Sequence, residues 1–585
     1  MKLHYITISA ILLSVTSCAD FDKINIDPEN SIYVGAGDTG NDSNDDERST
    51  SIDFPETIPD DELAFAKENE ASVESDFKTF SYEGMYNDYQ KTTNLTHDIY
   101  AGYFANNHPS FVNESPNYRY TDRYSSTRWE HFYRDRCKEY SRLTRVFKYV
   151  NPEKYKNAFY ITRIYFAFLG VQMVDTYGNI PFSDYVRGQN PREKARYDTG
   201  AEVYDMCFRI LAEAVENINP NDASQFTFSG NNDNCYHGDA SKWVRFANTL
   251  RLRMALRISN YDPDWARREG TAALTAKGGL IQNNEDNMRT IPKHAPTDLG
   301  GDGIGGNENV HAMCSYIYLD VVMSKDMELA YKTQSSRDDP RMQVCWYRPT
   351  PTTQLKDQDT EDTSSEFTGC AIGSSDIDRS SAKYSVIRSY SRNSTTLDNS
   401  RWFGYARESV WLSYAETKFL LAEAALRNWG TEKDAETYFK EGIQASCDYY
   451  GILSRLTTAY VNGVMSNLDE GVFTNNKEKA LEAIITQKWL AVFPNGNEGW
   501  AEFRRTDYPR LQNHIGNISE DVPVGKFIKR IRYPNSEYTS NQENIPQNYI
   551  DRQDTKIFWD IADTNNDSGI RQAPDNFRSQ CRFSD

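Results

Sequence analysis

The stretch of sequence that decides the fold runs from residue 411 to residue 443 and reads WLSYAETKFLLAEAALRNWGTEKDAETYFKEGI. Apolar and small residues recur in it at intervals of mostly three and four on both sides of Gly430. This spacing puts them on one face of each of two helices, with the glycine at the turn between them. The residues on these faces are Trp411, Tyr414, Ala415, Phe419, Ala422, Ala425 and Leu426, then Ala435, Tyr438, Phe439, Gly442 and Ile443. We therefore predict an antiparallel helix pair.

The same helical spacing recurs in other parts of the chain. One pair covers residues 155–171 and 201–215, and Gly178 and Pro181 end its first helix. Asp239 has the side chain of an N-cap and starts a helix that continues to residue 258, followed by a helix near residues 265–276. A last helix spans residues 479–491. The pattern predicts a mainly α fold, a tetratricopeptide-like helix-pair scaffold that lacks the strict period of roughly 34 residues.

Long segments without helical spacing interrupt this scaffold. They cover residues 278–305, 337–407 and 503–585, and all are rich in Gly, Pro, Asn, Ser and Thr. Binding residues are commonly carried on loops that a rigid scaffold holds in place. We therefore expect these long irregular insertions to carry the ligand-binding face, although some could be ordered lids without a ligand role.

The first residues predict an exported chain. Lys2 precedes an apolar run over residues 6–15, which is shorter than the roughly 20 residues that span a bilayer. Val15-Thr16-Ser17-Cys18 resembles the bacterial lipobox, so we predict a signal peptide at 1–17 and lipidation at Cys18. The alternative is a secreted chain with an incidental cysteine. Residues 18–60 are polar and acidic and predict a flexible lipid-anchored tether, and residues 61–585 predict a single helical domain.

The composition limits the partners. The formal net charge is -20 with no basic stripe to neutralise phosphates, so we predict no nucleic-acid partner. Aromatic residues make up 13% of the chain, which suits the faces of sugars or peptides and equally suits tight helix packing. The nine cysteines are spaced too widely for a zinc site, and the eight besides Cys18 could pair in an oxidising compartment.

Seven segments taken in order resemble the SusD/RagB nutrient-binding lipoproteins. They are YQKTTNLTHDIYAGYF (89–104), DTYGNIPF (175–182), GDASKWVRFANTLRLR (238–253), the helix at 411–425, QKWLAVF (487–493), EGWAEFRR (498–505) and RYPNSEYTSNQEN (532–544). Each segment alone is a weak signal. Their shared order behind a lipobox makes the chain similar to this family over most of its length.

The resemblance implies a surface-exposed, lipid-anchored protein of the outer membrane. Such a protein captures a nutrient, a glycan oligosaccharide or in some members a peptide, and acts as a lid on a SusC-type TonB-dependent transporter. Asp20 and Asp22 resemble the surface-export signal of these lipoproteins. The aromatic arc of the founding member cannot be aligned here residue by residue, so the substrate stays open.

The ligand-contact candidates are mostly aromatic residues of the insertions and of the 89–104 segment, which looks like the family's early helix, together with Trp129 in the stretch STRWEH. A flat ring can lie against a sugar, while amides and hydroxyls satisfy its polar groups. A role in packing is the competing interpretation for each of them. The candidates are Trp346, Tyr347, Trp402, Tyr405, Trp129, Asn94, Tyr100 and Tyr103.

Motifs for catalysis were not found in the sequence. It has no HExxH, no GxSxG and no local pairing of nucleophile and base, so we predict no catalytic residues and no enzyme activity. A surface-anchored glycan- or peptide-degrading enzyme is the alternative, and a pure protein scaffold is a third possibility. We expect no cofactor; residues 563–569 carry alternating oxygen donors like a calcium loop, but the glycine comes one position late.

Overall fold

The computed structural model describes residues 51–82, 84–85, 88–189, 195–290, 318–358, 361–388 and 408–561. The chain divides into two compact units. The larger unit consists of Thr50–Pro546 and Asp551–Asp585, and the smaller of Met1–Ser49 and Gln547–Ile550. Everything below concerns the described residues of the larger unit.

The regular elements of this unit are mostly helical. The α-helices are α2 (Asp60–Glu68), α3 (Val73–Phe80), α4 (Asp122–Glu130), α5 (Cys137–Tyr149), α6 (Pro152–Tyr177), α7 (Ser183–Val186), α8 (Gly200–Asn217), α9 (Ala240–Arg257), α10 (Pro263–Thr275), α12 (Lys325–Thr333), α13 (Pro340–Cys345), α14 (Thr352–Gln358), α15 (Tyr414–Leu426), α16 (Ala435–Tyr449), α17 (Ser454–Ser466), α18 (Val472–Asn475), α19 (Lys477–Val492), α20 (Gly496–Thr506) and α21 (Asn535–Ser540). Two π-helices are η2 (Gln90–Asp98) and η5 (His131–Arg136), and the 3-10 turns are η1 (Glu70–Ser72), η3 (Pro109–Phe111), η4 (Ser115–Asn117), η6 (Asn284–Asp286) and η9 (Gln542–Asn544).

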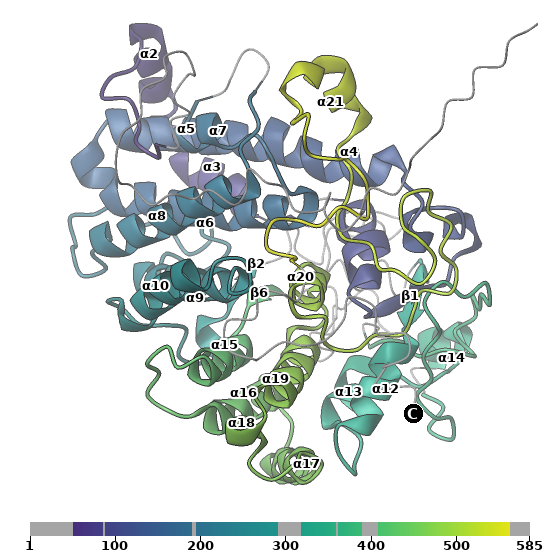
Figure 1. Cartoon of the computed structure of the whole chain (residues 1–585). Helices are drawn as coiled ribbons and strands as arrows, with labels where there is room; N and C mark the ends of the chain where they lie inside the picture. The colour runs from purple at the N-terminus through teal and green to yellow at the C-terminus, as the bar shows by residue number, and fades with distance from the viewer. Residues whose placement is uncertain are drawn as a thin grey trace, which may run out of the picture. The chain divides into compact units, whose positions relative to one another are not determined.

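Neighbouring helices pack in pairs, as the sequence predicts. α6 lies against α8, α9 against α10, and α15 against α16, while α19 packs on both α15 and α16. Figure 1 shows these helices stacked in chain order, from α5, α6 and α8 through α9 and α10 to α15 and α16. The predicted fold class, mainly α with tetratricopeptide-like helix pairs, is confirmed.

Local signals set the helix ends. Asp239 accepts hydrogen bonds from the backbone N–H groups of Ser241 and Lys242 and so caps α9. Gly178, with φ +82°, ends α6, and Gly430, with φ +85°, lies in the turn between α15 and α16. Left-handed backbone of this kind favours glycine because it has no Cβ to clash.

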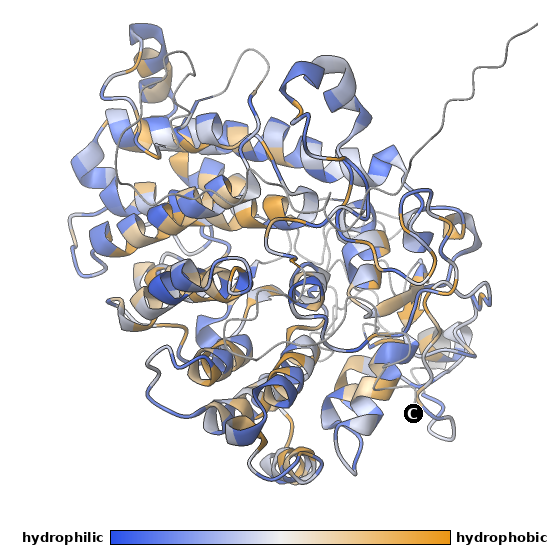
Figure 2. Cartoon of the chain, viewed as in Figure 1, coloured by the Kyte–Doolittle hydropathy of each residue, from blue (hydrophilic) through white to orange (hydrophobic). Residues whose placement is uncertain are grey.

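The pair that decides the fold is held at close range by a small residue. A Cβ added to Gly442 of α16 would lie 2.7 Å from the ring of Phe419 on α15. The Phe419 and Phe439 rings meet edge to face at 6.2 Å. Figure 2 shows hydrophobic and hydrophilic stripes on the same helices. Apolar residues supply many of the contacts between helices, but polar residues such as Glu416 and Glu423 of α15 are buried as well.

The predicted start of the first helix of this pair is wrong. Trp411 lies in strand β6 (Ser409–Leu412), and α15 begins at Tyr414 after Ser413 accepts a hydrogen bond from the Glu416 N–H. Ser413 caps the helix at this point, because its side chain accepts a hydrogen bond from a backbone N–H group of the first turn that has no partner within the helix.

Three two-stranded antiparallel sheets complete the unit. β1 (Phe104–Asn106) pairs with β3 (Val321–Met323), β2 (Met288–Thr290) with β6, and β4 (Trp346–Tyr347) with β5 (Val386–Ile387). In register, Phe104 faces Met323 and Trp346 faces Ile387. These ladders tie the early helix and the insertions to the helical scaffold.

Residues 51–59, which the sequence analysis placed in the tether, pack on the helical scaffold. Ile52 is buried and its carbonyl accepts a hydrogen bond from Arg163 at 2.9 Å. Phe54 meets Phe159 of α6 at 5.2 Å between ring centroids. Two apolar side chains in a polar stretch explain this docking, because their burial removes apolar surface from water.

The described cysteines do not form disulfides. Cys137, Cys207, Cys235, Cys345, Cys370 and Cys447 are free and buried. Cys207 and Cys447 lie on the buried faces of α8 and α16. Within the described residues, moreover, no helix has the length and apolar character needed to cross a bilayer.

Candidate functional site

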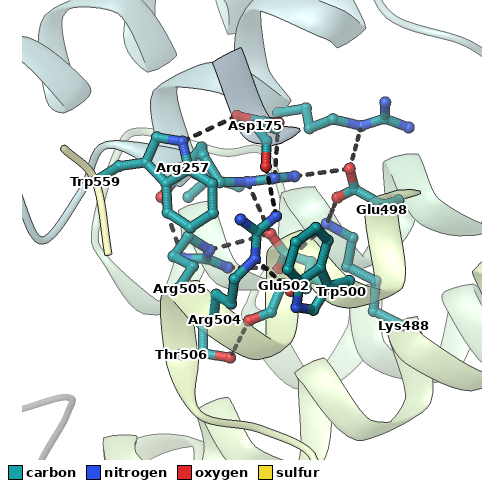
Figure 3. Close-up of polar contacts among 12 residues, drawn as sticks. Asp175, Arg257, Lys488, Glu498, Trp500, Glu502, Arg504, Arg505, Thr506 and Trp559 are labelled. Carbon is teal, nitrogen blue, oxygen red and sulfur yellow. Dashed lines mark hydrogen bonds and ion pairs between the residues drawn. The ribbon is translucent and has the colours of Figure 1, made fainter. Parts of the chain in front are cut away.

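Charged residues from five of the seven family-like segments meet inside the scaffold. Arg253 of α9 bonds to Glu416 of α15 at 2.6 Å, and Lys488 of α19 bonds to Glu498 of α20 at 2.9 Å. Figure 3 shows the centre of this arrangement. We call it the ion-pair network, and its members are Asp175, Arg253, Arg257, Glu416, Glu423, Lys488, Glu498, Glu502 and Arg505.

Each charge in the network has partners of the opposite sign. Arg257 reaches Glu498 at 2.7 Å, Asp175 at 3.1 Å and Glu502 at 3.3 Å. Arg505 bridges Glu423 and Glu502, both at 2.7 Å. Bidentate guanidinium contacts of this kind are strong charge-assisted hydrogen bonds.

The network lowers the pKa of some of its carboxylates in spite of burial. Burial opposes ionisation of Glu498, yet Arg253, Arg257 and Lys488 hold its pKa well below the usual value. In the same way, burial is outweighed at Glu502 by Arg505, Lys488 and Arg257, which lower its pKa to about 2. At Asp175 and Glu416, by contrast, burial outweighs the neighbouring cations and raises the pKa. The opposed charges are held by α6, α9, α15, α19 and α20.

Arg504 lies beside the network and is bound differently. It donates to the backbone carbonyls of Asp175 at 2.7 Å and Lys529 at 2.8 Å, and its guanidinium lies 3.6 Å from the centroid of Trp500. Burial lowers its pKa to about 9, although Asp175 and Asp560 oppose that shift. Apart from the partly exposed Asp175, these groups are buried, so the segments that carry the family resemblance here connect the helices internally.

Two of the predicted ligand residues on the insertion, Trp346 and Tyr347, are also buried. Trp346 is 0% exposed and lies between Phe104 at 5.5 Å and Phe493 at 5.2 Å. Tyr347 is buried beneath Arg388, whose guanidinium lies 4.3 Å from the ring centroid. Packing, the competing interpretation, therefore accounts for the positions of these two rings.

The physical reason is that the insertion builds a small core of its own. Its members come from both sides of the β1–β3 ladder and from the loops that follow. They are Ala105, Leu319, Val322, Tyr347, Leu355, Cys370, Tyr384 and Val386.

The candidates on the early helix and on α4 have internal partners. Tyr100 donates to the Ser115 carbonyl and Tyr103 to the Trp489 carbonyl, both at 2.8 Å. Asn94 is buried in η2 and donates to Asp98 at 3.3 Å. Trp129 is buried and its indole N–H donates to Glu537 of α21 at 3.2 Å. Trp402, Tyr405 and Cys18 lie outside the described residues. Contact of the eight candidate residues with a ligand stays a prediction, and so does lipidation at Cys18.

A different group of polar side chains does reach the surface where the early helix meets the insertion. Gln90 of η2 donates to Asp320 at 2.6 Å, and Arg379 lies 3.9 Å from the same carboxylate. Arg123 of α4 contacts Glu114 at 3.3 Å and donates to the Tyr124 hydroxyl at 3.1 Å. We call these six residues, Gln90, Glu114, Arg123, Tyr124, Asp320 and Arg379, the Asp320 cluster.

The Asp320 cluster combines one buried carboxylate with exposed cations. The Asp320 side chain is 2% exposed, whereas Arg123 is 47% and Arg379 is 42% exposed. Burial raises the pKa of Asp320 to about 6, although the Gln90 hydrogen bond and Arg379 lower it in part. The half-buried rings of His108 and Phe111 lie nearby with their centroids 4.9 Å apart and their planes tilted by 43°, and Arg379 acts electrostatically on His108.

This arrangement can satisfy a polar, uncharged ligand. Amide, guanidinium, phenol and carboxylate groups together donate to and accept from hydroxyls, and the His108–Phe111 pair offers an apolar face. Sequence spacing does not reveal the Asp320 cluster, because its members lie far apart in the chain. The sequence gives one signal for it, since ligand contacts are predicted on both the 89–104 segment and the 337–407 insertion.

No group of three or more His, Cys, Asp or Glu side chains among the described residues is arranged to hold a metal ion. The calcium-like loop at residues 563–569 lies outside them.

The comparisons with known proteins identify the family. The family model described as Susd and RagB outer membrane lipoprotein matches residues 70–560, so the chain belongs to the SusD-like family of outer-membrane lipoproteins. The chain is similar to the structure of a chitin-binding SusD homolog from Flavobacterium johnsoniae, with 25% identity and a TM-score of 0.67 over 86% of this chain and 99% of that one.

Other solved structures support the fold. A SusD homolog from Bacteroides uniformis has 24% identity and a TM-score of 0.67 over 86% of this chain and all (100%) of its own. One from Bacteroides ovatus has 22% identity and a TM-score of 0.66 over 86% and 100%. Among curated proteins no sequence matches the chain.

Proposed function

We propose that this protein is a cell-surface lipoprotein, anchored in the outer membrane through acylated Cys18, that captures a glycan oligosaccharide and delivers it to a SusC-type TonB-dependent transporter. It binds its ligand without turnover. The observation that carries the proposal is the match of the SusD/RagB family model over residues 70–560.

Two further observations support a glycan as the ligand. The similar structure from Flavobacterium johnsoniae is that of a chitin-binding protein. On this chain, the Asp320 cluster presents donors and acceptors beside the His108–Phe111 pair, a combination that suits sugar hydroxyls and the apolar face of a sugar ring.

Calorimetry on the chain carrying Cys18→Ala, which blocks acylation, tests the proposal. Chito-oligosaccharides, other neutral oligosaccharides and peptides serve as ligands, and Arg455→Ala, an exposed position on α17, serves as the control variant. We expect saturable binding of an oligosaccharide with no product released. Trp402→Ala in the same assay tests the contact predicted from the sequence.

Product formation from an oligosaccharide or peptide mixture would instead support the alternative, a surface-anchored degrading enzyme. Absence of binding to every glycan and peptide would point to the third possibility, a protein scaffold.

A further inference from the structure

A narrow cleft lies where β6 meets the C-terminal ends of α16 and α19. Glu408 and the residues of β6 line one side of it, Tyr449 and Tyr450 at the end of α16 line another, and the turn at Phe493 and Pro494 lines a third. Its volume is about 40 Å³ for the centres of water-sized molecules, which is room for about three waters. The cleft, which we call the β6 cleft, therefore suits one end of a ligand and not a whole chain.

The charges around the β6 cleft disfavour an anionic ligand. None of the described residues that line it is a lysine, an arginine or a histidine, whereas Glu408 and Glu416 both line it. Two helices also end at the cleft, α16 at Tyr449 and α19 at Val492. The C-terminal end of a helix carries a partial negative charge, which adds to the effect of the carboxylates.

Both carboxylates already have cationic partners. Glu408 contacts Arg289 of β2 at 3.0 Å, and Glu416 contacts Arg253 at 2.6 Å and Lys488 at 3.4 Å. A cationic ligand would compete with these side chains for charges that are already paired. The Glu408 side chain is 33% exposed, so its oxygens can still accept a hydrogen bond from a hydroxyl group. A neutral ligand that carries hydroxyl groups fits these conditions.

Polar and apolar side chains occur together along the cleft. Ser409 and Ser413 bring hydroxyl groups, and Val410 and Pro494 bring apolar surface; all four residues are half-buried. Small-molecule sites in proteins have this character, apolar surface with a small number of polar groups that fix the orientation of the ligand.

Tyr449 supplies the ring against which a sugar can lie. It is half-buried, lines the cleft and meets the buried ring of Tyr450 edge to face, with 5.2 Å between the centroids. Tyr450 is held in turn, because its hydroxyl donates to the Phe493 carbonyl at 3.3 Å. The Tyr449 ring therefore packs on a fixed neighbour, so little conformational entropy is lost when a sugar packs against it.

We propose that the β6 cleft is a second carbohydrate site, which takes one unit of a neutral sugar in contact with Tyr449 and Glu408. The cleft shares no described residue with the Asp320 cluster. The proposal rests on the proposed function, because the class of ligand is the same. It adds that one chain binds sugar at two separate places.

Calorimetry on the chain carrying Cys18→Ala tests the proposal, with chitotriose, cellotriose and maltotriose among the oligosaccharide probes. We expect two binding events per chain. Tyr449→Ala should weaken the event at the cleft about tenfold and leave the other event unchanged. Tyr149→Ala, at a half-buried tyrosine of α5, is the matched control and should leave both events unchanged.

Glu408→Gln provides a second variant at a partly exposed position. It should weaken the same event as Tyr449→Ala, because a charged acceptor becomes a neutral one. Asp320→Asn should weaken only the other event. If Tyr449→Ala does not fold, Glu408→Gln still decides whether the cleft binds sugar.

A crystal structure of the chain with the bound probe locates the second sugar, for which we expect density beside Tyr449. Density only outside the cleft, or an adventitious additive only, would overturn the proposal. So would sugar density in the cleft without a second calorimetric event, that is, binding at crystal concentration only.

The failure of this proposal can be told apart from the failure of the proposed function. A single binding event that neither Tyr449→Ala nor Glu408→Gln changes would overturn the second site and leave glycan capture in place. Absence of binding by every oligosaccharide probe would overturn both.

Discussion

The ion-pair network and the Asp320 cluster contain the same kinds of side chain but differ in how far these side chains are exposed to solvent. In the network, every carboxylate and cation except the partly exposed Asp175 is buried, and each contacts at least one opposite charge. In the Asp320 cluster, one buried carboxylate is held by a glutamine, and two arginines extend into solvent. The difference shows that charged residues of five family-like segments hold the internal scaffold together, whereas the exposed cations of the Asp320 cluster come from α4 and from the 337–407 insertion.

The largest effect is expected in the network. Arg257→Met leaves Glu498, Asp175 and Glu502 buried without one of their cations, and breaking one side of a buried pair costs about 3–5 kcal/mol. Denaturant unfolding would measure the loss of unfolding free energy. Arg134→Met, which removes a 66%-exposed ion pair on η5, should cost less than about 1 kcal/mol. Equal losses of unfolding free energy in the two variants would contradict the expected difference between network and surface charges.

A loss of similar size is expected for Trp346→Ala. The ring is fully buried between Phe104 and Phe493, and truncating a buried tryptophan costs about 3–5 kcal/mol of unfolding free energy. Thermal or denaturant unfolding would measure the change. A stable variant with weakened oligosaccharide binding would instead support the ligand contact predicted from the sequence.

Acid should weaken the network in a defined pH window. The folded-state pKa of Glu502 is about 2, below the value of about 4.3 expected in the unfolded chain. Its contribution to stability is therefore present above pH ~4.3 and is lost as the pH falls toward 2, on the order of 2–3 kcal/mol in all. Unfolding curves recorded between about pH 6 and about pH 2 would measure this loss of stability. In Glu502→Gln, this part of the acid dependence should be absent.

The smallest effect on stability, and the largest on binding, is expected for Asp320→Asn. Loss of the carboxylate should weaken oligosaccharide binding about tenfold, or ~1.4 kcal/mol, because a charged acceptor becomes a neutral one. Calorimetry would measure affinity, and Asp376→Asn, at an exposed carboxylate of the 337–407 insertion, should leave it unchanged.

The pH dependence of binding should follow the same carboxylate. Because the pKa of Asp320 is raised to about 6, its charged form is present above that pH and is lost below it. Affinity should therefore fall as the pH drops from about 7 to about 5, that is, from about one unit above this pKa to about one unit below it. The same titration of Asp320→Asn should be flatter, and identical pH profiles would exclude Asp320 from the binding site.

Local signals in the sequence predicted most of the helical scaffold. Spacing and end signals placed the helix pairs, and Asp239, Gly178 and Gly430 act at the positions expected of them. Helices could be predicted because their periodicity and caps depend on residues within a few positions of one another. The boundary error at Trp411 arose because an aromatic residue next to a helix continues its apolar spacing even when it belongs to a strand.

By itself, the sequence determined the mainly α class, the helix pairs and the resemblance to a family that the comparisons then established. Only the tertiary structure decided which charged residues meet in the ion-pair network, why Trp346 is core, and that Gln90 lies beside Asp320, 230 positions away. The physical reason is that spacing encodes local backbone conformation, whereas contacts between distant segments depend on how whole helices and insertions pack together.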